Sequence, residues 1–304
     1  MRTRVVLAVL GALLVAACGG SVGDGSGRRD RDPNAVTVEE LFASPVLLGQ
    51  LDDEVLQESS GLAASRRNPE ILWTHNDSGD GPAVYCLTRQ AARCGTWALT
   101  GAEALDWEDM AAGPGPVAGQ SYLYMGDIGD NNNNRADVIV YRVAEPMAPS
   151  ADATTLQATE ASEVIRLVYD DGAHDAEALM VHPLSGDIYV VIKDAADTGV
   201  YKAAAGTTTL VRISTLRLGF DEVVTGGDIA ADGRRAVVST YRRAYEYSLP
   251  AEVTNFDVIW DERRRPVSLP ARAQGEAIAY RLDGNALLTT SEKLPMPLHE
   301  MVRR

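Results

Sequence analysis

Residues 175–194, DAEALMVHPLSGDIYVVIKD, decide the fold of this chain. The stretch predicts one β-hairpin, with strands at Ala178–Val181 and Ile188–Ile192 joined by a turn rich in Pro, Ser and Gly. The second strand is an apolar run rich in β-branched residues, which is typical of a strand covered on both faces. Two carboxylates, Asp175 and Glu177, directly precede the first strand.

Four further stretches resemble this hairpin, and they lie at 58–77, 106–127, 226–242 and 274–293. The matched apolar positions are 48, 69, 50 and 49 residues apart: Leu62, Met110, Leu179, Ile229 and Ile278. This period is typical of the blades of a β-propeller. Two more strand-like runs lie in each interval, so the sequence predicts an all-β fold with blades of four antiparallel strands.

The sequence predicts five blades, with six as the alternative because the long second interval has room for another. That interval carries a polar insertion, rich in Ala and Thr, at Ala144–Ser162. The fifth unit ends with a strand at Leu298–Val302 and lacks an outer strand. We expect Val46–Leu51 to supply it, because a ring closed by the N- and C-terminal segments leaves no exposed edge.

The first residues predict export. Residues 1–17 have two arginines followed by an apolar run, and the sequence Leu14-Val-Ala-Ala-Cys18 resembles a bacterial lipobox. We expect residues 1–17 to be a lipoprotein signal peptide, 18–35 a flexible tether and 36–304 the propeller domain. An ordinary signal peptide with an incidental Cys is the alternative. Lipidated Cys18 would anchor the domain outside the cytoplasm on a bacterial membrane; inner membrane, outer membrane and cell surface remain open.

Charge and cysteine content narrow the possible partners. The chain has 28 basic and 43 acidic residues, a formal net charge of −15, which disfavours nucleic acid and is compatible with bound cations or with solubility alone. Cys86 and Cys94 flank a polar turn between two apolar runs, so in an exported protein we expect a disulfide; free thiols are the alternative. We expect a monomer that binds an unidentified small molecule or protein.

The repeat also predicts a site. In antiparallel blades, residues that precede the first strand and residues that follow the second strand meet at one end of the central channel. The residues before or at the start of the first strands are Glu58, Ser60, Asp106, Glu108, Asp109, Asp175, Glu177, Asp228 and Glu276. Those that end or follow the second strands are His75, Asn76, Asp77, Asp127, Lys193, Asp194, Tyr241, Arg242, Glu292 and Lys293.

So many carboxylates at one channel mouth need compensation. Lys193, Arg242 and Lys293 could pair with neighbouring acids, some carboxyl groups could have a raised pKa, or a Ca²⁺ ion could bind. Salt bridges and strand caps alone would also account for the pattern. Two loops rich in Asp, Asn and Gly, at His75–Gly81 and Asp127–Asn134, extend the same mouth, and such residues also simply favour turns.

The motifs SGLAAS…LWTHNDSGD, DWEDMA…YLYMGDIGDN and DAEALMV…GDIYVVIKD resemble exported bacterial propeller lipoproteins, which are similar to the phytase-like, or esterase-like, propeller family. The resemblance covers roughly 58–293. It implies Ca²⁺ held by mouth carboxylates and hydrolysis of phosphate esters, with acids Glu108, Asp127, Glu177 and Glu276 and bases Lys193, Arg242 and Lys293. The chain departs from that family in having few basic residues at the mouth and five units where the family has six.

Two functions are therefore expected. The first is a lipid-anchored binding propeller that holds a ligand or partner at the acidic mouth. The second is a Ca²⁺-dependent phosphoric or carboxylic ester hydrolase acting at the same mouth. The sequence leaves open whether the protein is an enzyme.

Overall fold

The structure is a computed structural model that describes residues 40–304, except 78, 151 and 221. The predicted signal peptide, the tether and Cys18 lie outside the described residues. Within the described part all the regular secondary structure is β-strand except for one 3-10 helix, η1, at Phe256–Asp261. No helix in this part is long and apolar enough to cross a membrane.

Most strands form antiparallel meanders. One meander contains β2–β5, at Ser59–Ala64, Ile71–Asn76, Ala83–Thr88 and Arg93–Thr100. The next contains β6, β7, β8 and β10, at Trp107–Pro114, Ser121–Asp127, Val138–Ala144 and Glu163–Tyr169. A third contains β11–β14, at Ala176–Val181, Ile188–Ile192, Thr198–Ala203 and Thr209–Leu216. A fourth contains β15–β18, at Val224–Ile229, Arg235–Thr240, Ala244–Ser248 and Arg265–Val267.

The last sheet combines the two ends of the described chain. Its strands β19, β20 and β21 lie at Ile278–Tyr280, Ala286–Thr289 and Met296–Val302. The outer strand is β1, at Val46–Leu51, which pairs antiparallel with β21. The expected contribution of this N-terminal segment is therefore present, and β21 is not left as a bare edge.

Two parallel pairings link the meanders. The segment at Ala144–Ser162 contains β9, at Leu156–Ala161, which pairs in parallel with β5. Two residue pairs also join β10 to β14 in parallel, so that two meanders form one eight-stranded sheet. The Cys86–Cys94 disulfide joins β4 to β5, as the sequence predicts.

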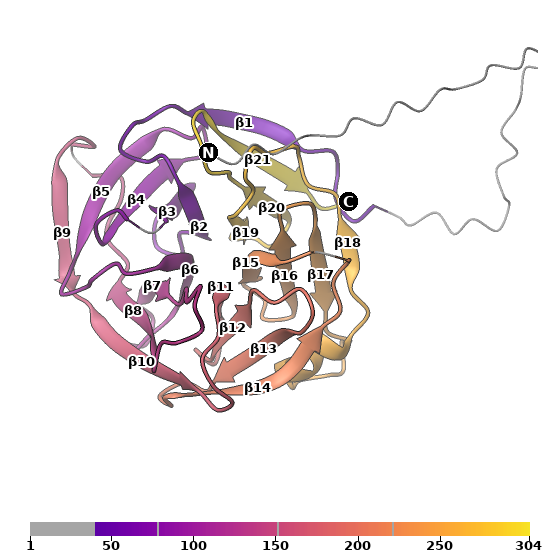
Figure 1. The fold of residues 1–304 in the computed structure, drawn as a ribbon. Helices are drawn as coiled ribbons and strands as arrows, with labels where there is room; N and C mark the ends of the chain where they lie inside the picture. Colours follow the sequence, from indigo (N-terminus) through magenta and orange to yellow (C-terminus); the bar gives the residue numbers. More distant parts are fainter. Residues whose placement is uncertain (1–39, 78, 151, 221) are drawn as a thin grey trace, which may run out of the picture. The chain divides into compact units, whose positions relative to one another are not determined.

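The sheets are arranged around a common centre (Figure 1). The first strands β2, β6, β11, β15 and β19 contact one another in cyclic order, and Figure 1 shows them innermost. Each of the five apolar clusters combines residues of two neighbouring sheets, so every sheet is covered on both faces. This explains why β12, Ile188–Ile192, is apolar throughout and completely buried.

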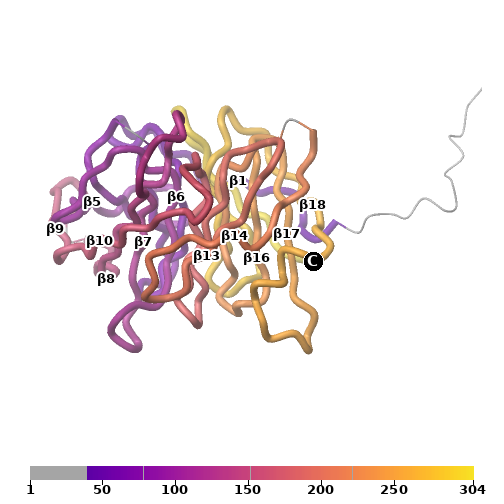
Figure 2. The backbone as a smooth tube through the Cα atoms, turned by 60° about the horizontal axis from the view of Figure 1, so that its bottom comes forward, coloured from indigo at the N-terminus to yellow at the C-terminus, as the bar shows by residue number. Residues whose placement is uncertain are grey.

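The chain runs back and forth between two faces formed by loops (Figure 2). We call the face at which the first strands begin the mouth face; there Ser59 pairs with Asn76. We call the opposite face the turn face; it carries the turns between first and second strands, and there Ala64 pairs with Leu72. This strand order and cyclic packing define a β-propeller.

Candidate functional site

The first strands are irregular where they reach the mouth face. Trp107 pairs with Asp127 and Asp109 with Gly126, so Glu108 is an extra residue in β6. In the same way Glu177 is an extra residue in β11, between Ala176 and Ala178. A β-bulge redirects the side chain that it carries. These two bulges therefore place a glutamate of two successive first strands at the same end of the channel.

Five carboxylates meet at this end, and we call them the acidic mouth: Asp77, Asp106, Glu108, Asp175 and Glu177. One oxygen atom of each of Asp77, Asp106 and Glu108 lies within 4.8 Å of the other two. The same holds for Glu108, Asp175 and Glu177, so Glu108 belongs to both groups. Two oxygen ligands on opposite sides of a Ca²⁺ ion lie about 5 Å apart, so each group has a spacing that one cation can bridge.

The loop after β7 packs directly against the acidic mouth. A Cβ atom on Gly129 would lie 2.3 Å from Glu108 Oε1 and 2.4 Å from Asp106 Oδ2, so only a glycine fits without moving these carboxylates. The loop is held in place because the Asp130 amide donates to Asp175 Oδ1 at 2.7 Å. The Asp175 amide in turn donates to Asn133 Oδ1 at 2.9 Å. The acidic mouth therefore has a fixed wall of backbone on one side.

One cation compensates part of this charge. The Lys193 ammonium forms an ion pair with Glu177, which is the first of the three pairings that the sequence suggests. Glu276 lies near enough to repel Glu177, and its Oε1 accepts a hydrogen bond from Gln274 at 3.2 Å. One ammonium among several carboxylates leaves the mouth with an excess of negative charge.

The excess charge appears as shifted pKa values. Burial, followed by repulsion from Glu177 and Asp77, raises the pKa of Glu108 to about 11. Burial also raises the pKa of Glu177, and Lys193 opposes that shift. The pKa of Asp106 is raised by burial and by three neighbouring aspartates. Glu108 therefore retains a proton that an isolated carboxyl group would release at neutral pH.

Two predicted site residues lie in the channel wall and outside the acidic mouth. Asp109 is completely buried, and its carboxylate accepts backbone hydrogen bonds from Met110, Leu179 and Gly227, in three different first strands. The Asp228 carboxylate accepts from the backbone amides of Ile229 and Tyr280, and burial raises its pKa to about 7. Their arrangement holds the first strands together.

Three others are also held by contacts outside the acidic mouth. Asp127, a predicted metal ligand, pairs with Arg135 at 2.7 Å and caps the backbone before β6, so it belongs to neither carboxylate group. His75 is fully buried, with Nδ1 2.7 Å from Asn76 O and its ring edge-on to Trp107. Asn76 Oδ1 accepts from the amides of the preceding loop at 3.1 Å.

The remaining predicted residues surround the acidic mouth. Tyr241 and Arg242 are exposed in the turn after β16, and Glu58 and Lys293 are exposed beside the last sheet. Glu292 is buried, and burial together with repulsion from Glu276 raises its pKa to about 8. These residues form a rim around the carboxylate groups.

Sequence reasoning did not assign a role to Gly129. Its position within the Asp- and Asn-rich loop was visible, but its contact with Glu108 and Asp106 depends on how the loop folds back against the start of β6. A glycine in a loop rich in Asp and Asn gives no signal that distinguishes close packing from a simple turn.

Comparison with known proteins adds little to this description. No family model and no curated protein matches the chain. Among solved structures, it is similar to one from a nidogen–laminin complex, with 13% identity, 77% of this chain and 72% of the other covered, and a TM-score of 0.46. A luciferin-regenerating enzyme has 11% identity, coverage of 85% and 95%, and a TM-score of 0.44. A hydrazine synthase from Kuenenia stuttgartiensis has 10% identity, coverage of 79% and 74%, and a TM-score of 0.44.

Proposed function

We propose that this chain is a five-bladed, exported β-propeller that binds Ca²⁺ at the acidic mouth and there holds a ligand or partner. The two carboxylate groups that share Glu108 carry this proposal. Five blades are favoured over six because β9 extends the first meander and does not start another. We further propose that lipidated Cys18 anchors the protein as a monomer on a bacterial membrane.

The choice of Ca²⁺ follows from the donor set. All five side chains of the acidic mouth offer carboxylate oxygens, which are the ligands that hard cations prefer. Ca²⁺ accepts six to eight oxygens in a flexible geometry, whereas Mg²⁺ demands a near-ideal octahedron. Five carboxylates contributed by separate loops and strands fit the more tolerant ion. A bound cation would also relieve the repulsion that raises the pKa of Glu108.

Gly129→Ala tests the proposal without changing any charge. Gly129 does not have a positive φ, and the three atoms nearest to the added methyl group belong to the carboxylates of Glu108 and Asp106, so we expect the fold to persist and the Glu108–Asp106 spacing to change. Ca²⁺ should raise the melting temperature of the metal-free wild type. For the same rise, Gly129→Ala should require a Ca²⁺ concentration at least about tenfold higher.

Gly81→Ala is the matched control, because a Cβ atom there meets open space. It should respond to Ca²⁺ like the wild type. A wild-type protein whose melting temperature ignores both Ca²⁺ and EDTA would refute the proposal. Equal Ca²⁺ responses of the wild type and Gly129→Ala would refute the assignment of the ion to this place.

A second candidate is a Ca²⁺-dependent hydrolase of phosphoric or carboxylic esters at the same mouth. The position of Lys193 favours this second candidate. Its ammonium forms an ion pair with Glu177 beside the two carboxylate groups, where it can also contact an anionic ester. Release of phosphate or alcohol that needs Ca²⁺ and is lost in Lys193→Met would support this candidate. Ca²⁺ binding without any ester cleavage would exclude the hydrolase and favour the binding protein.

A further inference from the structure

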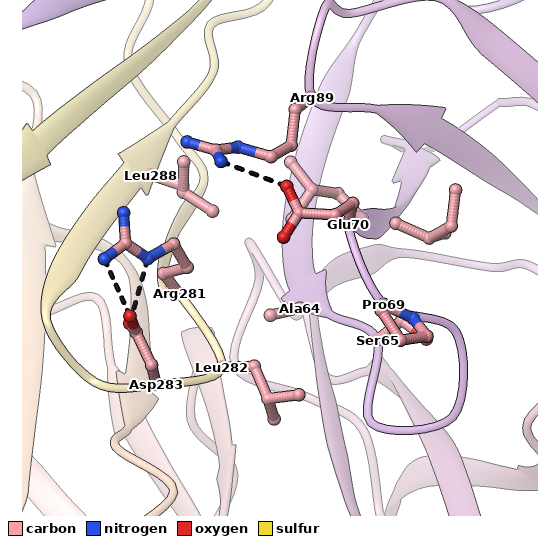
Figure 3. Close-up of a pocket in the computed structure, with 11 residues that line it drawn as sticks. Ala64, Ser65, Pro69, Glu70, Arg89, Arg281, Leu282, Asp283 and Leu288 are labelled. Atoms are coloured by element: carbon pink, nitrogen blue, oxygen red, sulfur yellow. Dashed lines mark hydrogen bonds and ion pairs between the residues drawn. The ribbon is translucent and has the colours of Figure 1, made fainter.

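A second cavity lies on the turn face, away from the acidic mouth. It has a volume of about 270 Å³ and lies between the β2–β3 turn and the β19–β20 turn (Figure 3). Its walls are mainly apolar side chains, among them Pro69, Ile71, Leu282 and Leu288. Two guanidinium groups, those of Arg89 and Arg281, also line it. The carboxylates of Glu70 and Asp283 line the same edge, so the cavity combines an apolar interior with a rim of ion-paired charges.

The two arginines are held side by side by one buried acid. Glu300 Oε1 accepts from Arg89 at 2.7 Å and from Arg281 at 2.8 Å, and its side chain is 9% exposed. The second partner of each arginine is a surface acid. Glu70 pairs with Arg89 at 3.0 Å and is 68% exposed, and Asp283 pairs with Arg281 at 2.7 Å and is 48% exposed.

The outer pair of Arg89 is replaceable. An ion pair between exposed side chains contributes little to stability, so a carboxylate from a ligand can take the place of Glu70, which contacts Arg89 through one hydrogen bond, at small cost. Asp283 holds Arg281 through two hydrogen bonds and stays in place. A planar guanidinium binds carboxylates in a two-pronged geometry. The buried Glu300 would keep both arginines in position during this exchange, because it does not depend on the outer partners.

We propose that this cavity binds a small amphipathic monocarboxylate, with its carboxylate on Arg89 in place of Glu70 and its apolar body against Leu282 and Leu288. The size fits, because an apolar cavity of about 150 Å³ holds a benzene molecule, so 270 Å³ accommodates an apolar body of about seven to nine carbon atoms. The bound molecule would bridge the first and last sheets, beside the place where β1 closes the ring.

Octanoate is a suitable probe, and calorimetric titration in the presence of EDTA keeps any effect of cations at the acidic mouth out of the measurement. We expect octanoate to bind in the millimolar range or tighter. Octan-1-ol, which lacks the charge, and acetate, which lacks the apolar body, should each bind at least about tenfold more weakly. No octanoate binding at about 10 mM, or equal binding of octanol, overturns the proposal.

Two variants locate the ligand. Leu282→Glu adds a like charge inside the cavity and should weaken octanoate binding by about tenfold or more. Leu282 is 42% exposed, so the fold tolerates the change. Leu184→Glu is the matched control, since Leu184 is exposed in the corresponding turn between β11 and β12 and does not line this cavity. Equal octanoate affinities in the two variants would overturn the assignment.

Glu70→Gln tests the exchange itself. Removing the competing carboxylate should free one side of Arg89 and tighten octanoate binding severalfold, with no comparable effect on octanol. A purely apolar cavity would give the same affinity for both proteins. That result would refute recognition of the carboxylate by Arg89.

Discussion

Replacing Glu108 by Gln should change how stability depends on pH in the metal-free protein. Burial and neighbouring acids raise the pKa of Glu108 from 4.5 to about 11. Between these values the folded protein holds a proton that the unfolded chain has released, so folding takes up a proton. The free energy of unfolding therefore falls as pH rises through this window.

The size of the effect follows from proton counting. One extra proton in the folded state costs about 1.4 kcal/mol for each pH unit. From about pH 5 to about pH 8 this corresponds to a loss of at most about 4 kcal/mol of stability through the proton on Glu108. Gln carries no proton to exchange, so Glu108→Gln should lose this part of the slope and become more stable than the wild type at the upper end.

Urea unfolding at several pH values, in EDTA, measures both slopes. Glu103→Gln is the control, because Glu103 is exposed and lies on the chain segment just before β6. It should follow the wild type at every pH. Parallel curves for the wild type and Glu108→Gln would show that the acidic mouth does not hold the proton, and the electrostatic description of the site would then be wrong.

Two further predictions concern the stability of the propeller fold. Asp109→Asn leaves one oxygen for the three backbone amides that the carboxylate now accepts, so we expect a loss of about 1–3 kcal/mol in urea unfolding. An unchanged midpoint would mean that Asp109 does not link the first strands. Replacing both Cys86 and Cys94 by Ser should cost about 2.5 kcal/mol for the short loop that the disulfide closes. A reductant should lower wild-type stability to the same level, and a reductant without effect would contradict this.

The repeat predicted much of the fold, because the matched apolar positions occur once in the first strand of each sheet and their spacing is the length of one sheet unit. Leu62, Met110, Leu179, Ile229 and Ile278 all lie in the first strands, or at the end of one. The closing role of Val46–Leu51 was also visible, because the last unit lacked one strand. The parallel pairing of β9 with β5 was not visible, since a polar insertion gives no periodic signal for the partner that it will choose.

The site was predicted only in part, and for a physical reason. Position along the first strand placed Glu108 and Glu177 near the channel end, and the structure adds the bulges that bring them close to Asp77, Asp106 and Asp175. Periodicity alone cannot separate such residues from their immediate neighbours. Asp109 and Asp228 precede the same apolar positions and instead face backbone amides in the channel wall. The cavity on the turn face could not be predicted from the sequence, because it depends on which turns become neighbours in the folded protein.

The most direct test of the central claim is the number of protons released when Ca²⁺ binds. Calorimetric titration of the metal-free protein near neutral pH, in two buffers with different ionisation enthalpies, gives this number together with the affinity. Because Glu108 holds a proton in the metal-free site, we predict binding with the release of about one proton for each ion. Absence of Ca²⁺ binding, or binding with the same heat in both buffers, would contradict the account.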